Sequence, residues 1–381
     1  MSFNQYTWDL YKQTTIGIEM IKYFSDAGGY VLFKDYCPYA NFIPEDLYND
    51  WLENIYCYGV SDYDHPSSLE EAKDLYISLI TLGIRVEGQQ WLPANDFKNM
   101  LGIIQPMSYV LSQFAPEYFF PYLFLCRIFE LNKIADFFNI DLPNIPKRTD
   151  YKGRCMYYWE LCEVFYLFRK ENGLSPADLW SFLYDFAPNN LPSEKIDMPK
   201  PSQVWFIGGR LYQEDKSLES KFWQSSPETK KGDILVHYET SPISAITCIE
   251  TSLTDGVIDP LFRYYGCIYI GNRINIPHIT LKELQTDEYF FKHPLVRKNF
   301  QGVNGWSVNS ENYSELLRMI KTKGFDIEVL PKLYAPTLPK DVIIEYEHDV
   351  EQQLLEPLLN SMGWYEKKDF IRQLPIQAGR G

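Results

Sequence analysis

Residues 204–250 constrain the fold most, because they form a series of short apolar, β-branched runs separated by turn residues. The first run, 204–207, ends in Gly208 and Gly209, and residues 222–227 read Phe-Trp-Gln-Ser-Ser-Pro. A Lys-Gly-Asp opening at 231–233 leads into a third run, and similar runs follow as far as residue 281. Strands this short, bounded by Gly, Pro, Asp and Asn, are typical of a small barrel.

The chain before this region has the spacing of helices rather than strands. Apolar and aromatic residues recur at i, i+3 and i+4, and Ser175-Pro176 is a helix start in which the serine caps and the proline takes the first helical position. A further helix is expected at 310–321. We therefore predict an α+β multidomain chain with a helical domain at 1–198, a small β-barrel at 199–330, and a linker with a truncated α/β segment at 331–381.

Composition places the protein among soluble intracellular proteins. No run of about 18 apolar residues is present to span a bilayer, and the N-terminus lacks the basic and apolar blocks of a signal peptide. The seven cysteines are odd in number and contain no CxxC pair, so we expect reduced core thiols rather than disulfides or a zinc site. We expect a cytoplasmic location and no membrane partner.

Charge is unevenly distributed. Residues 1–199 carry 15 basic and 27 acidic side chains, whereas 200–330 carry 15 and 16. Non-specific affinity for nucleic acid comes from neutralised phosphates, so the acidic first half is not a polyanion-binding surface. Any contact with nucleic acid is expected in the middle segment.

The middle segment resembles two related families. Phe206-Ile207-Gly208-Gly209 followed by residues 222–227 resembles the opening of the YTH readers of methylated adenine, and Lys231-Gly232-Asp233 with the following strand is similar to the EVE family. Both belong to the PUA-like superfamily, whose members bind modified or flipped bases in a pocket on a small barrel. The resemblance covers roughly residues 203–322 and depends on the order of the motifs.

The resemblance implies a base pocket with Trp223 as its aromatic wall. Its other members would be the backbone after the first strand, two hydroxyls and the opposite loop: Gly208, Gly209, Ser225, Ser226, Tyr238, Ser241 and Pro242. No second or third cage aromatic stands at a matched position, and the substitutes considered are Tyr212, Phe222, Tyr264 and Tyr265. On the residue alone, Trp223 could equally fill the barrel.

Phosphate contacts would come from the cations of the middle segment. Arg210, Arg273, Arg297 and Lys298 are the candidates, each of which could also be an ordinary charge on a solvated face.

Residues 345–381 bear a second, shorter resemblance. Glu347 and Glu351 with the leucines that follow are similar to the start of the nuclease fold at the front of type I restriction motor subunits. The later catalytic strands of that fold are absent, and the Glu-x-Lys spelling at 366–368 is interpreted as accidental. We expect a strand at 370–376, a natural protein that continues beyond Gly381, and endonuclease activity only if a nuclease domain follows.

Other chemistry has little support in the sequence. No GxxxxGK[ST], GxGxxG or GxSxG motif is present, and His237 and His278 have no carboxylate partner at ligand spacing, so we expect no catalytic residue, metal or cofactor. Asp62, Asp64 and His65 form a polar cluster that is interpreted as a solvated loop.

These observations favour the sensing part of a modification-dependent restriction or antiphage nuclease, which binds DNA carrying a flipped modified base. The helical domain would contact DNA, a partner chain or another copy. Two alternatives stay open: an RNA-binding reader, and a protein-interaction scaffold with a vestigial pocket.

Overall fold

The computed structural model describes residues 3–38, 40–192, 198–211, 220–334, 343–362 and 364–371. The chain forms two compact units, and the class is α+β multidomain. The helical unit comprises residues 1–194 and 257–265, and the sheet unit comprises 195–256 and 266–381. The described residues beyond 330 group with the sheet unit.

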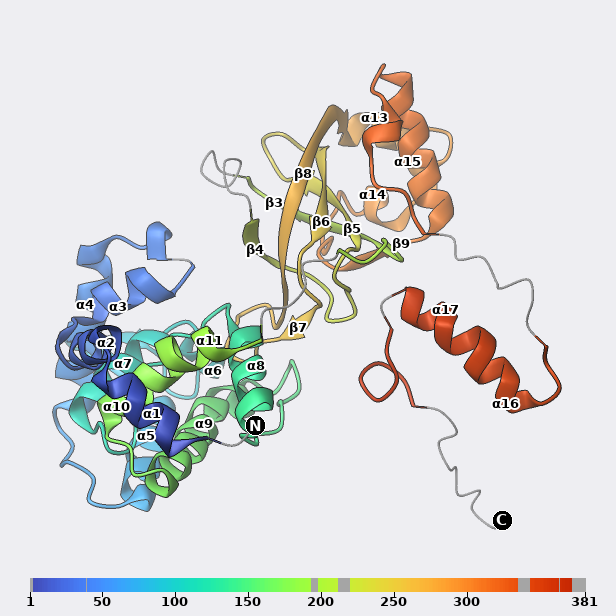
Figure 1. Cartoon of the computed structure of the whole chain (residues 1–381). Helices are drawn as coiled ribbons and strands as arrows, with labels where there is room; N and C mark the ends of the chain where they lie inside the picture. The colour runs from blue at the N-terminus through green and yellow to red at the C-terminus, as the bar shows by residue number, and fades with distance from the viewer. Residues whose placement is uncertain are drawn as a thin grey trace, which may run out of the picture. The chain divides into compact units, whose positions relative to one another are not determined.

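The helical unit is built mainly from helices (Figure 1), and its buried core is rich in aromatic side chains. Its helices are α1 (Gln5–Gln13), α2 (Thr15–Asp26), α3 (Gly29–Tyr36), α4 (Glu45–Ile55), α5 (Leu69–Leu82), α6 (Phe97–Met100), α7 (Ile104–Phe114), α8 (Ile128–Phe138), α9 (Tyr151–Glu171), α10 (Pro176–Ser181) and α11 (Ala187–Asn190). A π-helical turn, Tyr56–Val60, extends α4, and β1 (Ile84–Val86) pairs with β2 (Gln89–Leu92). The predicted start of α10 is confirmed, since Ser175 and Asp178 form a capping box.

Segment 257–265, which contains β7 (Val257–Ile258), joins the helical unit because buried polar groups hold it there. Arg154 of α9 donates from Nε to the carbonyl of Pro260 at 2.8 Å and from Nη2 to that of Phe262 at 2.7 Å. The carboxylate of Asp259 accepts backbone N–H groups, including that of Cys126 at 3.1 Å. Burial raises the pKa of Asp259 to about 6.

The sheet unit is a curled mixed sheet with the strand order β4-β8-β6-β5-β3-β9. The strands are β3 (Val204–Gly209), β4 (Ser220–Gln224), β5 (Ile234–Glu239), β6 (Ala245–Ser252), β8 (Gly266–Thr280) and β9 (Trp306–Val308). β3 and β5 are parallel, and the other pairs along this order are antiparallel. The expected short runs at 204–207, 234–238 and 243–250 fall on β3, β5 and β6.

Helices cover one face of this sheet: α13 (Leu281–Thr286), α14 (Pro294–Arg297) and α15 (Ser310–Thr322) (Figure 1). The helix predicted at 310–321 is thus confirmed as α15, which Asn309 caps. Alternate residues of β5, such as Val236 and Tyr238, pack in this core, while Leu235 points to the opposite face with Trp205 and Ile207.

The C-terminal residues contain α16 (Glu347–Val350) and α17 (Glu356–Ser361), joined by a π-helical turn. The strand expected at 370–376 lies almost entirely outside the described residues. Lys368, the lysine of the Glu-x-Lys sequence at 366–368, forms an ion pair in which its Nζ lies 2.5 Å from Oδ2 of Asp255.

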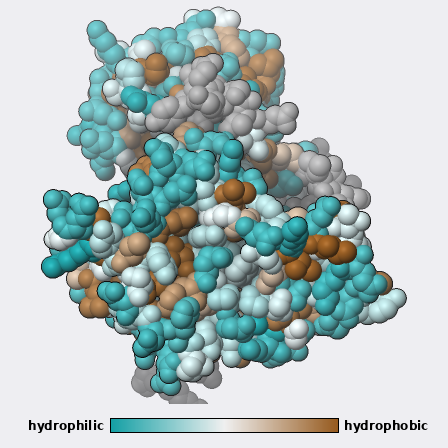
Figure 2. Space-filling model, turned by 90° about the vertical axis from the view of Figure 1, so that its left-hand side faces the viewer, coloured by the Kyte–Doolittle hydropathy of each residue, from teal (hydrophilic) through white to brown (hydrophobic). Residues whose placement is uncertain are grey.

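No helix in the described parts of the chain has both the length and the apolar character that a bilayer span requires. On the face shown in Figure 2, hydrophobic residues form separate patches within a largely hydrophilic surface. All seven cysteines are free thiols; six are buried as expected, and Cys57 is exposed.

Replacing Arg154 tests the anchoring of segment 257–265. We expect Arg154→Met to lower the free energy of unfolding of the helical unit by about 3 kcal/mol, because buried backbone carbonyls lose their donor. Urea unfolding of the full chain measures this. Lys152→Met, at an exposed position on the same helix, should change stability by less than about 0.5 kcal/mol. Equal effects of the two substitutions would contradict the anchoring role.

Candidate functional site

Trp223 lies on β4 and points to the sheet face opposite the helices. Its indole packs against the small cluster formed by Trp205, Ile207, Leu235 and two isoleucines, and it is half-buried rather than sealed. Gly209 lies directly against the ring: a Cβ atom there would stand 2.6 Å from Cζ2 of Trp223. Any larger residue at position 209 would therefore displace the indole.

Asn304 fixes the edge of the indole. Its Oδ1 accepts from Nε1 of Trp223 at 3.2 Å and from the backbone N–H of Gly208 at 2.8 Å, while its Nδ2 donates to the carbonyl of Gly208 at 2.9 Å. The turn that carries Asn304 ends at Gly305, whose φ of 77° favours glycine. Asn304 is not among the residues predicted from the sequence, because an asparagine next to a glycine is an ordinary turn signal.

A buried network of charged and polar groups lies on the same face as Trp223. His237 Nδ1 lies 2.9 Å from Oε2 of Glu250, and Nε and Nη2 of Arg273 each lie 2.9 Å from Oε1. Lys221 Nζ is 3.6 Å from the same Oε1 and 4.9 Å from the centroid of the Trp223 ring. The sequence showed no carboxylate partner for His237; the pairing of β5 with β6 supplies Glu250.

The network determines the protonation of its members. Burial would raise the pKa of Glu250, but the His237 hydrogen bond and the neighbouring cations hold that pKa at about 2. Burial lowers the pKa of His237 despite the Glu250 carboxylate, which favours a neutral ring at pH 7. With Nδ1–H donating to Glu250, Nε2 carries the lone pair, and this buried atom has no hydrogen-bond partner among the described residues.

The His237 ring also contacts the proposed aromatic wall. Its centroid lies 4.8 Å from that of Trp223, with the ring planes at 59°. The indole is therefore bounded by Gly209, Lys221 and His237, and its edge is held by Asn304. This arrangement can present a positioned aromatic surface to a flat ligand.

A metal ion does not fit this network, although His237, Cys248 and Glu250 bring possible ligand atoms within 4.8 Å of one another. Both oxygens of Glu250 already have partners, and two cations lie beside them. Burial raises the pKa of the Cys248 thiol to about 12, so it is protonated at neutral pH. A metal would have to displace the partners of Glu250 and would be repelled by the cations.

The other predicted pocket residues lie in different surroundings. Ser225 is buried, with its Oγ 2.9 Å from Oγ1 of Thr229, whereas Ser226 is half-buried and its Oγ accepts from the backbone of Glu228. Tyr238 stacks on Phe300 at 4.0 Å in the helix-covered core, so the structure does not bring it to Trp223.

The loop after β5 does approach the glycines. The backbone N–H of Thr240 donates to the carbonyl of Gly209 at 3.2 Å. Ser241 and Pro242 are exposed, and Arg210 donates to the carbonyl of Ser241 at 3.3 Å.

Phe222, the substitute aromatic described in the sheet unit, does not join Trp223 in a cage. Phe222 is the sequence neighbour of Trp223, so it points to the other side of β4, and its ring packs edge-on against Tyr269. Tyr264 and Tyr265 belong to the helical unit, and Tyr212 lies outside the described residues.

The four candidate phosphate contacts divide into two kinds. Arg210, Arg297 and Lys298 are exposed. Arg273 is largely buried, and its guanidinium is paired with Glu250. Arg273 therefore belongs to the internal network rather than to an exposed basic surface.

Comparison with known proteins finds neither a matching family model nor a matching curated protein. Solved structures resemble about a third of the chain. An NMR structure of a protein from Rhodopseudomonas palustris is 14% identical, covers 32% of this chain and 94% of its own, and has a TM-score of 0.28. A hypothetical protein from Leishmania major is 12% identical, and the match covers 32% of this chain and 98% of that protein, with a TM-score of 0.27. A protein from Agrobacterium tumefaciens is 18% identical, and the match covers 31% of this chain and 92% of that protein, also with a TM-score of 0.27. Such likenesses say nothing about the function of this chain.

The pKa of His237 gives a test of the network. The pKa of His237 is lowered in the folded state, so the contribution of His237 to the stability of the sheet unit is complete above about pH 6.5. That contribution falls as the pH decreases, because only the unfolded chain then takes the proton. We expect the slope to approach at most about 1.4 kcal/mol per pH unit. His237→Gln should flatten it. Urea unfolding between pH 7.5 and 5 measures this slope for the sheet unit. The unfolding transition of the sheet unit is the one that Arg154→Met, a change in the helical unit, leaves in place.

The exposed His278 provides the control for this experiment, because His278→Gln should keep the original slope. Two other groups of the sheet unit remain in the His237 variant and contribute slopes of opposite sign: His293, whose pKa burial lowers, and Asp233, whose pKa burial raises to about 6. A profile that His237→Gln leaves unchanged would contradict a neutral buried ring at this position.

Proposed function

We propose that the chain recognises a modified base in DNA, and that its sheet unit acts as a PUA-like barrel of the EVE or YTH kind. The observation that carries the proposal is the partly exposed indole of Trp223, whose edge is held by Asn304 above a buried charged network. A protein that modifies or recognises a single base moves that base out of the stack and into a pocket. A positioned indole offers a surface against which such a base can lie.

Stacking alone would supply much of the affinity. A base stacked on an aromatic side chain contributes about 1–3 kcal/mol, largely independent of its sequence. Discrimination then needs hydrogen bonds to the base edge. Ser226 is suited to this role, because its oxygen accepts from Glu228 while its hydroxyl hydrogen can still donate. Gly208 and Gly209 would line the pocket mainly by their small size, since the N–H and carbonyl of Gly208 are already bonded to Asn304.

The charge distribution supports placing DNA on the sheet unit. The exposed side chains of Arg210, Arg297 and Lys298 can contact phosphates, whereas residues 1–199 have a large excess of acidic groups. The helical unit is then free to bind a partner chain or another copy. In this proposal the protein works in the cytoplasm as the sensor of a restriction or antiphage system, with cleavage supplied by a nuclease domain.

Replacing Trp223 tests the proposal directly. We expect Trp223→Ala to weaken binding to a duplex carrying the recognised modification by about 5- to 150-fold, because base stacking is lost. Fluorescence anisotropy with labelled duplexes measures this for plain, methylated, hydroxymethylated and glucosylated cytosine and for methylated adenine. Trp223→Phe should retain part of the affinity, since it keeps an aromatic face.

Trp306 is the matched control, because it is also half-buried but packs on the helix-covered side of the sheet. Trp306→Ala should leave the preference for modified DNA unchanged. Tighter binding to a modified single-stranded RNA would favour the RNA-reader alternative. Equal, negligible affinity for all these nucleic acids would reject base recognition and leave the interaction scaffold.

The exposed cations make a separate prediction about salt. The magnitude of the negative slope of log K against log salt should fall by about 0.9 in Arg210→Ala and by about 1.8 in the Arg297→Ala, Lys298→Ala double variant, as phosphate contacts are lost. Affinity should fall equally for modified and plain duplexes. Arg318→Ala is the control, since Arg318 pairs with Asp287 and Glu315 on the surface. Unchanged slopes would exclude these cations from the DNA contact.

A further inference from the structure

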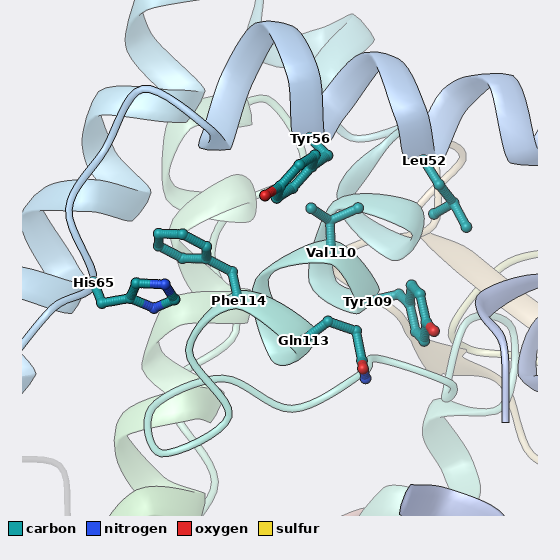
Figure 3. A pocket seen from close by; sticks show the side chains of 7 residues that line it. All are labelled: Leu52, Tyr56, His65, Tyr109, Val110, Gln113 and Phe114. Atoms are coloured by element: carbon teal, nitrogen blue, oxygen red, sulfur yellow. The ribbon is translucent and has the colours of Figure 1, made fainter. Parts of the chain in front are cut away.

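The helical unit contains a cavity that base recognition does not use. It has a volume of about 350 Å³ and lies between α4, with its π-helical extension, and α7. Figure 3 shows Leu52 and Tyr56 on one wall and residues of α7 on the other, with His65 at one end. This volume falls in the range of small-molecule sites, which are about 300–1,000 Å³.

The lining is mainly aromatic. Tyr56 and Phe114 face the space from opposite walls, and Tyr109 stands toward the other end (Figure 3). The His65 ring stacks on Phe114, with centroids 4.1 Å apart and planes at 15°. Leu52, Val110 and the amide of Gln113 complete the lining. The loop of His65 thus contributes to a cavity wall, a role that its interpretation as a solvated loop did not include.

The segments that supply the lining of the cavity carry acidic side chains but no lysine or arginine. Residues 45–65, which supply Leu52, Tyr56 and His65, contain six carboxylates and no lysine or arginine, and α7 has no charged side chain. The six carboxylates are Glu45, Asp46, Asp50, Glu53, Asp62 and Asp64. Within the described chain none of them forms an ion pair with a lysine or arginine. Their field therefore favours a cation in this region and disfavours an anion.

We propose that this cavity binds a small organic cation that joins an aromatic ring to an ammonium group. The aromatic ring occupies the apolar space beside Phe114 and Val110. The ammonium group is attracted by the faces of the tyrosines and by the surrounding carboxylates, since cations bind favourably over aromatic rings. This binding is independent of the base-recognition proposal, because every residue involved belongs to the helical unit.

Three probes of the same ring but different charge test the proposal on the full chain. Benzyltrimethylammonium, benzyl alcohol and phenylacetate carry a cation, no charge and an anion, respectively. Protein-observed NMR or isothermal titration calorimetry should give at least fivefold tighter binding for the cation than for the alcohol, and no binding of phenylacetate. Equal affinities for the cation and the alcohol, or binding of phenylacetate, would overturn the proposal.

Substitutions then locate the site. Phe114→Leu should weaken binding of the cation at least fivefold, whereas Tyr58→Ala should leave it unchanged, because Tyr58 is exposed on the same π-helical turn but does not line the cavity. Asp62→Asn with Asp64→Asn should weaken binding of the cation and leave that of benzyl alcohol unchanged. Urea unfolding checks that each variant is folded. Binding that none of these changes affects would overturn the assignment.

Discussion

The sheet unit depends on the hydrogen bond and ion pairs of the Glu250 carboxylate. This carboxylate is buried, and its two oxygens are shared by His237, Arg273 and Lys221. Removing an ion from water costs several kcal/mol, and a buried pair offsets that cost only with good geometry. Because the four residues come from β4, β5, β6 and β8, the register of these strands is coupled to one charge network. The same network forms the surroundings of Trp223.

The sheet has two faces with different roles. Val236 and Tyr238 of β5 enter the core under the helices, while the residue between them, His237, points to the face of Trp223. A shift of one residue would exchange these environments and bury the charged network against aliphatic side chains. The alternation of the strands therefore places the charged network on the face opposite the helices, which is where the base-recognition proposal places its ligand.

The two units also divide the charge of the chain. The helical unit carries 15 basic and 27 acidic side chains, whereas the sheet unit carries 21 and 24. Ligands of opposite charge are therefore suited to the two proposed sites: a phosphate-bearing polymer for the sheet unit and a small cation for the helical unit. Both sites use aromatic surfaces, and the charged groups around each surface favour one class of ligand over the other.

Local signals in the sequence predicted many of the elements. Ser175 and Pro176 mark the start of α10, the apolar spacing of 310–321 predicts α15, and the short runs between 204 and 250 predict β3, β5 and β6. These features follow from capping and from the period of apolar residues, which depend on neighbours in the chain. The family resemblance, by contrast, implied that Tyr238 shares a pocket with Trp223, although the two residues lie on opposite faces of the sheet.

By itself, the sequence determined the α+β class, the elements and the separation of charge, because composition and local periodicity are sufficient for these. Only the tertiary structure decided that segment 257–265 belongs to the helical unit, that Asn304 holds Trp223, and that Glu250 meets His237 and Arg273. His237 and Glu250 are 13 residues apart in the sequence, and Trp223 and Asn304 are 81 apart. Such partners meet through strand register and long-range packing, which no local pattern encodes.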